Sequence, residues 1–317
     1  MRKATSAPEL RPCRLGNLPV MNGTTAVASS TVGWRDRLGA YFALTKPRII
    51  ELLLVTTVPA MVLAARRWPG TGLVLATLIG GTLSAAGANT LNCYFDRDID
   101  EVMRRTSRRP LPRHQVSPSA AMIFGILLGL AGFLWLWAFT NVVAATISTL
   151  ALLFYVFVYT RWLKRTTDQN IVVGGAAGAA PALVGWAAVQ GSVGLPAWIL
   201  FAVVFYWTPP HFWALALRYE ADYAKAAVPM MPVVRGVAPT TRQMLLYAGL
   251  TGLASLLLVP VAGMGWIYLL SAVTLGGVFI WETWLVHRDP GRAMMLFTYS
   301  TRYLALLFAA VMLDVLV

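Results

Sequence analysis

The stretch ANTLNCYFDRDIDEVMRRTSRRPLPR, residues 88–113, leaves a membrane-length apolar segment and passes directly into acidic and then basic residues. Within it, Asn92, Asp96 and Asp100 follow one another at intervals of four residues. On an α-helix this interval stacks side chains along one face. The sequence therefore predicts a ladder of three oxygen-bearing side chains at the end of a membrane helix. Asp98 and Glu101 point elsewhere around such a helix, so we leave them out of the ladder.

This acid ladder has the chemistry of a magnesium site. Mg²⁺ takes oxygen ligands and often bridges from carboxylates to substrate phosphates. Guanidinium groups bind phosphate oxygens in pairs. Six arginines interleave with the ladder or follow it: Arg97, Arg104, Arg105, Arg108, Arg109 and Arg113. Beside a bilayer, this combination predicts a lipid diphosphate as substrate. The alternative is a solvated helix end where the charges only pair with each other, but ionisable groups at membrane depth favour function.

The composition indicates a membrane protein with one folded domain. Of the 317 residues, 58% are apolar and 12% charged, whereas soluble domains carry about 25% charged residues. We expect a disordered cytoplasmic tail at 1–40, rich in small and basic residues, and a single transmembrane domain at 41–317. The two cysteines, Cys13 and Cys93, predict neither a disulfide nor a thiolate metal site.

The fold class predicted from the apolar runs is an all-α polytopic membrane protein. Nine runs approach the length of about 20 residues that crosses a bilayer. They lie near 48–65, 71–95, 120–139, 142–160, 171–190, 197–217, 244–263, 266–286 and 295–317. Turn-like segments such as 66–71 and 190–196 separate them. Only Thr140 and Asn141 separate the third run from the fourth.

The positive charges predict the orientation of these spans. With nine spans, 23 of the 26 Lys and Arg residues fall on the side that carries the tail. By the positive-inside rule this side is cytoplasmic, which places the N-terminus inside and the C-terminus outside. Because topology explains the net charge of +13, nucleic acid is excluded as a partner.

The expected location is a bacterial plasma membrane. The tail contains Arg2, Arg11 and Arg14, which would suit a mitochondrial transit peptide and hence the mitochondrial inner membrane. Proline, glycine and Glu9 interrupt any amphipathic helix there, so we keep that location as the alternative.

Further candidate residues lie on the same predicted face of the membrane. Asp222, in RYEADYAKAAVP, is a candidate for a second metal-facing carboxylate, and Glu220 is a weaker one. The expected diphosphate-binding cations are Lys46, Arg108, Arg109, Lys164 and Arg165. The positive-inside rule alone accounts for most basic residues on this side, so each of these assignments competes with a purely topological one.

His211, in YWTPPHFWALAL, is the one histidine inside a predicted span. A buried, hydrogen-bonded histidine is the ordinary interpretation, and a porphyrin contact or axial iron ligand is the alternative. Aromatic residues around it and at 154–159 would line an apolar substrate cavity or pack between helices.

The motifs together resemble a known family. Asn92–x3–Asp96–x3–Asp100 followed by RRTSRRPLP resembles the first aspartate motif of the UbiA superfamily of intramembrane prenyltransferases. A set of sequence blocks, which run in order from about 44 to 236, more narrowly resembles the heme-farnesylating branch of that superfamily. These are LTKPR, NCYFDRDID, RTSRRPLP, YTRWLKRTTDQNIVVGGAAGA, TPPHFWALAL and DYAKAAVPMMPVVRG.

The resemblance implies a UbiA-type bundle of nine helices around a central cavity. It also implies transfer of farnesyl from farnesyl diphosphate to a vinyl group of heme B, giving heme O for heme A synthesis. Mg²⁺ would be held by Asn92, Asp96, Asp100 and Asp222, and His211 would contact heme. A downstream heme A synthase is then an expected partner, with the bilayer as the surroundings.

The sequence departs from the family pattern in one motif, and two other functions compete with the one that the resemblance implies. Many superfamily members carry a second Asp–x3–Asp motif, whereas here Ala226 follows Asp222, which leaves the ligands of a second Mg²⁺ open. One rival is a UbiA-type enzyme with an aromatic quinone precursor as acceptor. The other is a cation-coupled transporter, although the acids cluster at helix ends rather than at the bilayer midplane.

Overall fold

The computed structural model describes residues 33–317, apart from the side chains of 48–49 and 51–54. All regular structure in this part of the chain is helical. The helices are α1 (Trp34–Leu44), α2 (Pro47–Ala65), α3 (Thr71–Phe95), α4 (Arg97–Val102), α5 (Pro118–Phe139), α6 (Val142–Leu153), the π-helix η1 (Phe154–Leu163), α7 (Lys164–Thr166), α8 (Asn170–Gln190), α9 (Leu195–Arg218), α10 (Glu220–Lys225), α11 (Met231–Arg235), α12 (Val237–Ala262), α13 (Trp266–Arg288), the 3₁₀-helix η2 (Pro290–Arg292) and α14 (Ala293–Leu316).

The predicted all-α membrane fold is confirmed. Within 33–317, eight helical segments are long and apolar enough to cross a bilayer. They match the predicted spans from 71–95 onward. The first predicted span corresponds to α2, in which Val55–Ala65 is counted only as a shorter apolar helix. The total of nine spans therefore stays a prediction.

Local signals in the sequence explain several helix boundaries. Asn141 accepts a hydrogen bond from the Ala144 backbone nitrogen at 2.9 Å and so caps α6. This cap separates the third predicted span from the fourth. Gly191 and Gly263 end α8 and α12 in the left-handed conformation, which glycine adopts without steric cost.

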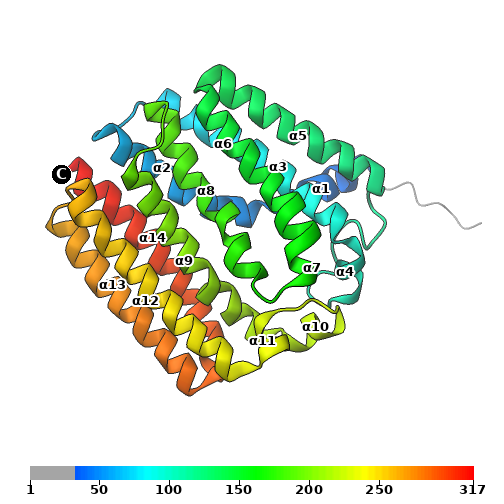
Figure 1. The fold of residues 1–317 in the computed structure, drawn as a ribbon. Coiled ribbons are helices and arrows are strands. Elements are labelled where there is room, and N and C mark those ends of the chain that lie inside the picture. The colour runs from blue at the N-terminus through cyan, green and yellow to red at the C-terminus, as the bar shows by residue number, and fades with distance from the viewer. Residues whose placement is uncertain (1–32) are drawn as a thin grey trace, which may run out of the picture. The chain divides into compact units, whose positions relative to one another are not determined.

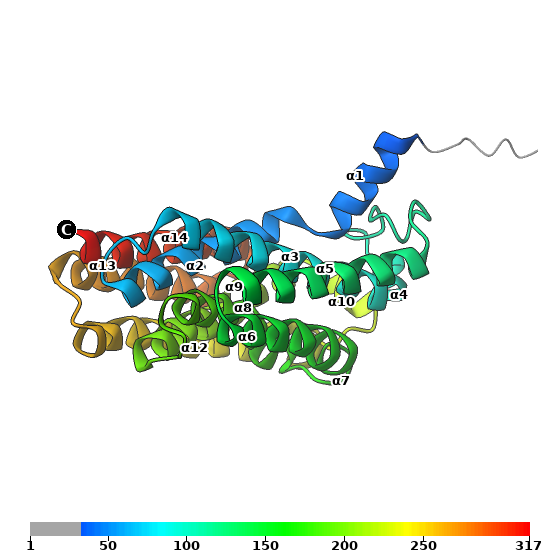
Figure 2. The same cartoon turned by 90° about the horizontal axis from the view of Figure 1, so that it is seen from above.

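The expected tail at 1–40 differs from the structure at its C-terminal end. Residues Trp34–Leu44 form helix α1, which Figure 2 shows projecting away from the other helices at the end where α4 and α10 lie. Residues 1–32 lie outside the described part of the chain, so the prediction of disorder there stays untested.

The small helices gather at one end of the long ones. Figure 1 shows α4, α7, α10 and α11 together at the end opposite the C-terminus. They follow or precede α3, α8, α9 and α12 along the chain. The connections that carry most of the predicted site residues therefore meet at one end of the bundle.

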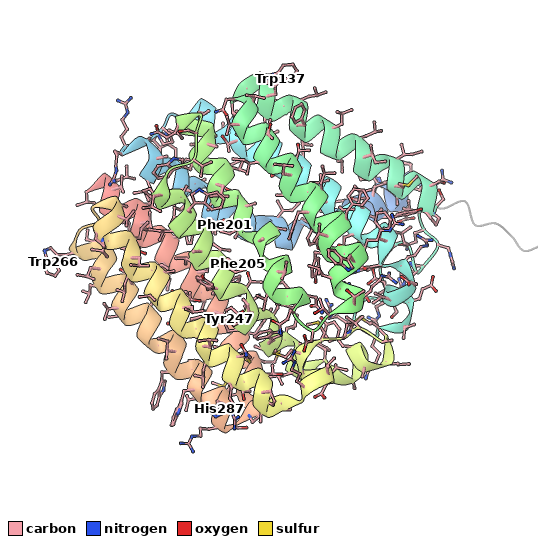
Figure 3. All side chains as sticks on the ribbon, viewed as in Figure 1. Trp137, Phe201, Phe205, Tyr247, Trp266 and His287 are labelled. Carbon is pink, nitrogen blue, oxygen red and sulfur yellow. The ribbon has the colours of Figure 1, made fainter. Side chains whose placement is uncertain are left out.

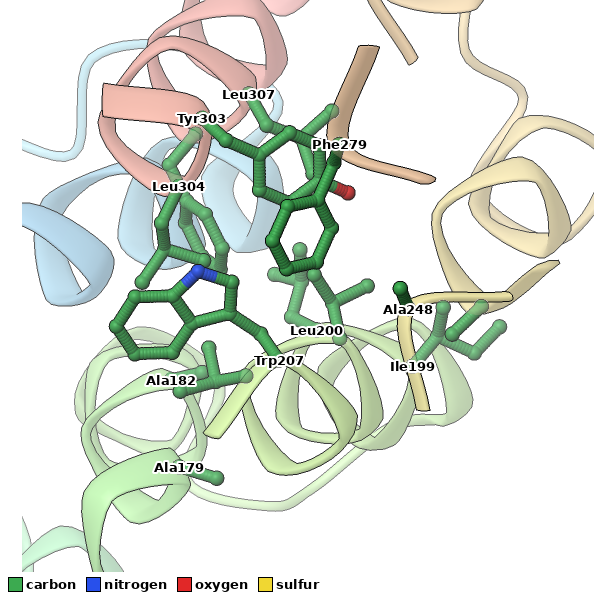
Figure 4. Packing of buried hydrophobic residues seen from close by; sticks show 14 of the residues in the cluster. Ala179, Ala182, Ile199, Leu200, Trp207, Ala248, Phe279, Tyr303, Leu304 and Leu307 are labelled. Atoms are coloured by element: carbon green, nitrogen blue, oxygen red, sulfur yellow. The ribbon is translucent and has the colours of Figure 1, made fainter. Parts of the chain in front are cut away.

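Large side chains pack where α8, α9, α13 and α14 meet. In Figure 4, Trp207 of α9 lies between Ala182 of α8 and Leu304 of α14, with Phe279 and Tyr303 stacked beside it. Trp207 also donates a hydrogen bond to the Ser300 carbonyl at 2.8 Å. Its indole N–H is therefore satisfied inside the core.

Glycines allow α3 and α5 to pack closely. A Cβ atom at Gly87 would lie 2.7 Å from the Gly129 nitrogen and 2.8 Å from the Gly125 oxygen. Small residues at such contacts are typical of helix pairs in membranes. This contact holds α3, and with it the start of the acid ladder, against α5.

The outward surface suits lipid. Many large apolar side chains face outward, among them Leu127, Leu134 and Leu270. In Figure 3, Trp137 on α5 and Trp266 on α13 point away from the bundle. Both tryptophans lie near helix ends, where aromatic side chains mark the boundary between membrane and water.

Candidate active site

A cavity of about 560 Å³ opens among α2, α3, α6, η1, α8, α9 and α14. Ligand pockets in proteins have volumes of about 300–1,000 Å³. One part of this cavity is lined by charged residues from the ladder and its partners. Most of the remaining lining is apolar or small, including Gly81, Ala85, Gly178 and Val204. An ionic ligand group and an apolar body could therefore be held in one space.

The acid ladder lines this cavity, although it is not one uninterrupted helix. Helix α3 ends at Phe95, α4 begins at Arg97, and Asp96 between them has φ −92° and ψ 5°. The backbone hydrogen bonds continue across the break, from Asp96 to Asn92 at 2.9 Å and from Asp100 to Asp96 at 2.8 Å. The four-residue stacking therefore survives. All three side chains line the cavity and are buried within the protein.

Three cations contact the ladder. The Lys46 ammonium donates to Asn92 Oδ1 at 2.5 Å, and the Lys164 ammonium donates to Asp96 Oδ2 at 2.6 Å. The Arg109 guanidinium reaches both carboxylate oxygens of Asp100, at 2.8 and 2.7 Å. The structure therefore brings together six of the residues selected from the sequence, although they come from distant parts of the chain.

The ladder fits a magnesium ion in one specific respect. Asp96 Oδ1 is buried and has no hydrogen-bond partner among the described residues, and the nearest guanidinium nitrogen, from Arg165, is 4.0 Å away. A buried carboxylate oxygen without a partner is costly unless a cation or donor meets it. Residues 33–317 contain no cluster of three or more His, Cys, Asp or Glu arranged for a metal. Two carboxylates and an amide nevertheless suit Mg²⁺, which keeps several waters and takes further oxygens from phosphates.

Three of the predicted site residues do not line the cavity. Asp222 lies half-buried in α10, and it is the neighbouring Tyr223 that lines the cavity. Arg108 is exposed to solvent. Arg165 forms a bidentate ion pair with Asp98, with both distances 2.7 Å. Arg165 also comes within 4.0 Å of Asp96 Oδ1. The proposed contacts of all three residues with metal or diphosphate stay predictions.

The ion pair of Asp98 separates it from the ladder. The hydrogen bond from Arg165 lowers the pKa of Asp98 to about 2 from its ordinary value of 3.8. The Asp98 side chain is 59% exposed and lines no part of the cavity. Its place apart from Asp96 and Asp100 agrees with its predicted direction around the helix.

The π-helix η1 supplies one contact that sequence reasoning missed, Thr160, whereas Tyr155 and Tyr159 belong to the aromatic group at 154–159 that was a candidate cavity lining. Thr160 accepts a hydrogen bond from Asn92 Nδ2 at 2.9 Å and donates to the Tyr155 carbonyl at 2.8 Å. Tyr155, Tyr159 and Lys164 all line the cavity. In an α-helix, Tyr155 and Lys164 would lie about 180° apart around the axis. The wider π-helical turns place them on the same side.

Arg105 also lines the cavity, although it was not among the predicted diphosphate-binding residues. It belongs to the arginine-rich segment after the ladder, where spacing alone does not distinguish it from Arg104 or Arg108. The position of Arg105 depends on the irregular chain between α4 and α5, which carries no periodic signal.

Comparison with known proteins gives the family. Residues 53–311 match the model of the UbiA prenyltransferase family. The chain belongs to this family. A protoheme IX farnesyltransferase of Clavibacter michiganensis subsp. michiganensis (strain NCPPB 382) is 52% identical to it over 293 residues, which are 91% of this chain and 96% of that protein. This UbiA family chain is accordingly a prenyltransferase and a multi-pass membrane protein.

Two solved structures show the same fold at low sequence identity. One concerns digeranylgeranylglyceryl phosphate synthase and has a TM-score of 0.73 at 19% identity, covering 88% of this chain and 99% of that one. The other is a UbiA homolog from Archaeoglobus fulgidus bound to GPP and Mg²⁺, with a TM-score of 0.60 at 14% identity and coverages of 86% and 99%. The UbiA fold expected from the sequence is therefore confirmed.

Within this UbiA fold, His211 occupies a constrained position at the cavity. It is buried, lines the cavity, and lies between Trp207 and Phe297, whose ring centroids are 4.3 and 4.4 Å from its own. Its Nδ1 is 2.7 Å from Ser300 Oγ, which donates to the Phe297 carbonyl. Either atom can be the donor in this bond; in the tautomer whose Nδ1–H donates to Ser300, Nε2 is the unprotonated nitrogen.

Proposed function

We propose that this prenyltransferase transfers the farnesyl group of farnesyl diphosphate to a vinyl group of heme B and so produces heme O. The observation that carries the proposal is the continuity of the acid ladder and its three cations with an apolar cavity that also contains His211. The Clavibacter relative, named for farnesyl transfer to protoheme IX, supports the choice of both substrates.

At the charged part of the cavity, the proposed task is to hold and neutralise diphosphate. Lys46, Lys164 and Arg109 lie within hydrogen-bond distance of the ladder, and Arg105 also lines the cavity. When diphosphate binds, these cations can exchange ladder oxygens for phosphate oxygens. Arg108 and Arg165 are proposed as further contacts. Positive charge fixed at the leaving group favours breaking of the C1–O bond.

We propose that Asn92, Asp96 and Asp100 hold Mg²⁺, with Asp222 as a further ligand. Bound there, the ion would supply Lewis-acid charge to the departing diphosphate. The unpartnered oxygen of Asp96 is the atom best prepared for it. Asn92 is oriented for the same role by Thr160, which accepts one of its amide hydrogens.

The apolar part of the cavity is proposed to protect the reactive carbon. The C1–O electron pair leaves with diphosphate, the vinyl π electrons form the new C–C bond, and water then adds to the porphyrin-side carbon and loses a proton. Tyr155 and Tyr159 stack on each other at 5.4 Å beside the ladder. Their faces can stabilise the allylic cation electrostatically. Small and apolar residues keep other water away.

His211 is proposed to contact heme B. Its Nε2 can bind iron or meet the porphyrin, while Ser300 and the two flanking rings fix the plane of the imidazole. Heme is a substrate in this proposal and Mg²⁺ the cofactor.

The proposed setting is a bacterial plasma membrane, with the ladder on the cytoplasmic side. The C-terminus would then lie outside. The mitochondrial inner membrane is the alternative setting. A heme A synthase that consumes heme O is the expected downstream partner.

The deciding experiment uses detergent-purified protein with heme B, farnesyl diphosphate and Mg²⁺, followed by mass analysis of the pigments. We expect a heme enlarged by a hydroxylated farnesyl group, and no such product with EDTA. Unchanged heme from protein that binds both substrates would contradict the proposal and favour an aromatic acceptor. Absence of diphosphate binding would contradict both and favour the transporter.

A further inference from the structure

A second hollow lies outside the cavity, where the ladder end of α3 meets α5 and η1. We call it the arginine groove; its volume is about 680 Å³. It is lined by Tyr94, Phe95, Arg97, Asp98, Met122, Arg161 and Arg165. None of these residues lines the cavity of the candidate active site. The function proposed above leaves Arg97 and Arg161 without a role.

The charges of the arginine groove are unbalanced. Asp98 is its one acidic residue, and both carboxylate oxygens of Asp98 are bound by Arg165. Arg97 and Arg161 form no ion pair with any side chain that the structure describes. Two exposed guanidiniums therefore remain available to an anion.

Aromatic rings support these two arginines. The Arg97 guanidinium carbon is 4.8 Å from the centroid of the Tyr94 ring, and that of Arg161 is 5.8 Å from the Phe95 ring. Cation–π contact engages the face of a guanidinium and leaves its in-plane N–H groups available. The Arg97 side chain gives one of these donors to the Tyr94 carbonyl, whereas Arg161 has no hydrogen-bond acceptor among the described residues. Such groups suit bidentate contact with phosphate.

Exposed apolar side chains lead away from the arginine groove on both sides. On α6 and η1 they are Leu150, Leu153 and Phe157, at intervals of about one turn before Arg161. On α5, Ile126 and Leu130 follow Met122 at intervals of about one turn, and the adjacent Ile123 is also exposed. Phe157 lies against Phe95, with ring centroids 6.3 Å apart. A phosphate held by the arginines would thus have hydrocarbon-compatible walls extending toward the membrane interior.

We propose that the arginine groove binds an anionic phospholipid of the leaflet nearest the acid ladder. Its phosphate would meet Arg161 and Arg97, and its acyl chains would lie along the two apolar rows. The apolar rows are the reason for choosing a membrane lipid over free phosphate, which has no use for them. Anionic lipids are attracted to arginine at the membrane surface by about 1 kcal/mol per residue. This inference does not depend on the identity of the prenyl acceptor.

The test titrates the detergent-purified full chain with dioctanoyl phosphatidylglycerol and, separately, with dioctanoyl phosphatidylcholine, and counts bound lipid by native mass spectrometry. We expect tighter binding of phosphatidylglycerol. The variant Arg161→Gln should weaken that binding about fivefold, the factor that corresponds to about 1 kcal/mol. Arg288→Gln is the matched control, because Arg288 also lies over a ring, Trp284 at 5.1 Å, but does not line the arginine groove.

A second variant tests the groove without changing its charge. Met122→Trp adds a ring at the apolar wall and should also reduce binding of phosphatidylglycerol, while the thermal unfolding temperature of each variant shows that it is folded. Equal affinity for the two lipids would overturn the proposal, and so would equal losses in Arg161→Gln and Arg288→Gln. Displacement of the lipid by millimolar inorganic phosphate would assign the site to free phosphate instead.

Discussion

Two aspartates in one short segment have opposite surroundings. Asp96 is buried, lines the cavity and has one oxygen without a hydrogen-bond partner, whereas Asp98 is exposed and has both oxygens bound by Arg165. The spacing of the ladder predicted this separation, because residues two apart point to different sides of a helix. The partners of each carboxylate could not be predicted, since they come from segments nearly 70 residues away in the chain.

The first prediction compares these two aspartates. Asp96→Asn removes a charge that the proposed mechanism requires, so turnover of farnesyl diphosphate should fall at least about 10²–10³-fold, the usual cost of losing one electrostatic group. Asp98→Asn is the control and should keep most of the activity. Steady-state assays on protein confirmed to be folded and inserted would measure both. Retained activity in Asp96→Asn would contradict the proposal that Asp96 holds Mg²⁺.

The second prediction concerns pH. The pKa of Asp98 is about 2 in the folded protein and 3.8 ordinarily, so its ion pair stabilises the fold fully above pH 3.8 and loses this effect as the pH falls toward 2. The unfolding temperatures of the wild type and Asp98→Asn should therefore differ by a constant amount above about pH 4 and converge below it. A difference that persisted unchanged to pH 2 would show that the pair does not depend on the charge of Asp98.

The third prediction concerns His211. If it contacts heme B, His211→Ala should weaken heme binding, followed by the Soret absorption, more than it weakens binding of farnesyl diphosphate. Ser300→Ala leaves the imidazole in place but removes its Nδ1 partner, and it should produce a smaller change of the same kind. Equal loss of both ligands in His211→Ala would indicate that the residue only packs the core.

At the scale of helices, sequence reasoning located the long elements closely. Every predicted span from 71–95 onward corresponds to a helix, because apolar length is a strong signal in membrane proteins. It did not find α1 or the π-helix. Apolar periodicity does not distinguish η1 from an α-helix when both faces of the segment are apolar, so the placement of Lys164 beside Asp96 could not be derived from spacing.

The fourth prediction tests the contact between α3 and α5. Gly87→Ala brings a methyl group against the backbone of α5, which cannot move aside as a side chain could, and should cost about 1–3 kcal/mol of stability. Gly81→Ala on the same helix is the control, since its Cβ meets no atom of the described residues within 4 Å. Thermal unfolding in detergent measures the stability of both variants, and equal losses would show that α3 and α5 leave room for a methyl group at Gly87.

For the whole molecule, the distribution of charge is the main evidence for the proposed orientation in the membrane. The acid ladder, the short helices and most basic residues of the described part of the chain lie at one end. Trp68 lies in the connection that precedes α3, at the other end of that helix. The sequence predicted this arrangement because hydropathy and charge act over entire segments. It could not predict the cavity, which depends on how seven helical segments pack.

The fifth prediction follows from that orientation. In a background with Cys13 and Cys93 changed to serine, Trp68→Cys should react with a membrane-impermeant maleimide added to intact cells. Glu101→Cys, at the ladder end, should react only after the cells are opened. The reverse pattern would invert the proposed topology, and labelling of both in intact cells would contradict the assignment of spans.

The π-helix η1 also has a consequence at the level of the gene. Deleting one codon within 154–163 would keep nearly every side chain in the protein, yet it would shorten the wide π-helical turns and rotate each residue after the deletion relative to those before it. Lys164 would then leave Asp96, and Tyr155 would no longer share a side with it. The reading frame would be intact, but the proposed arrangement of Lys164 and Tyr155 at the acid ladder would be lost. In this segment, the number of residues therefore matters as much for the site as their identity.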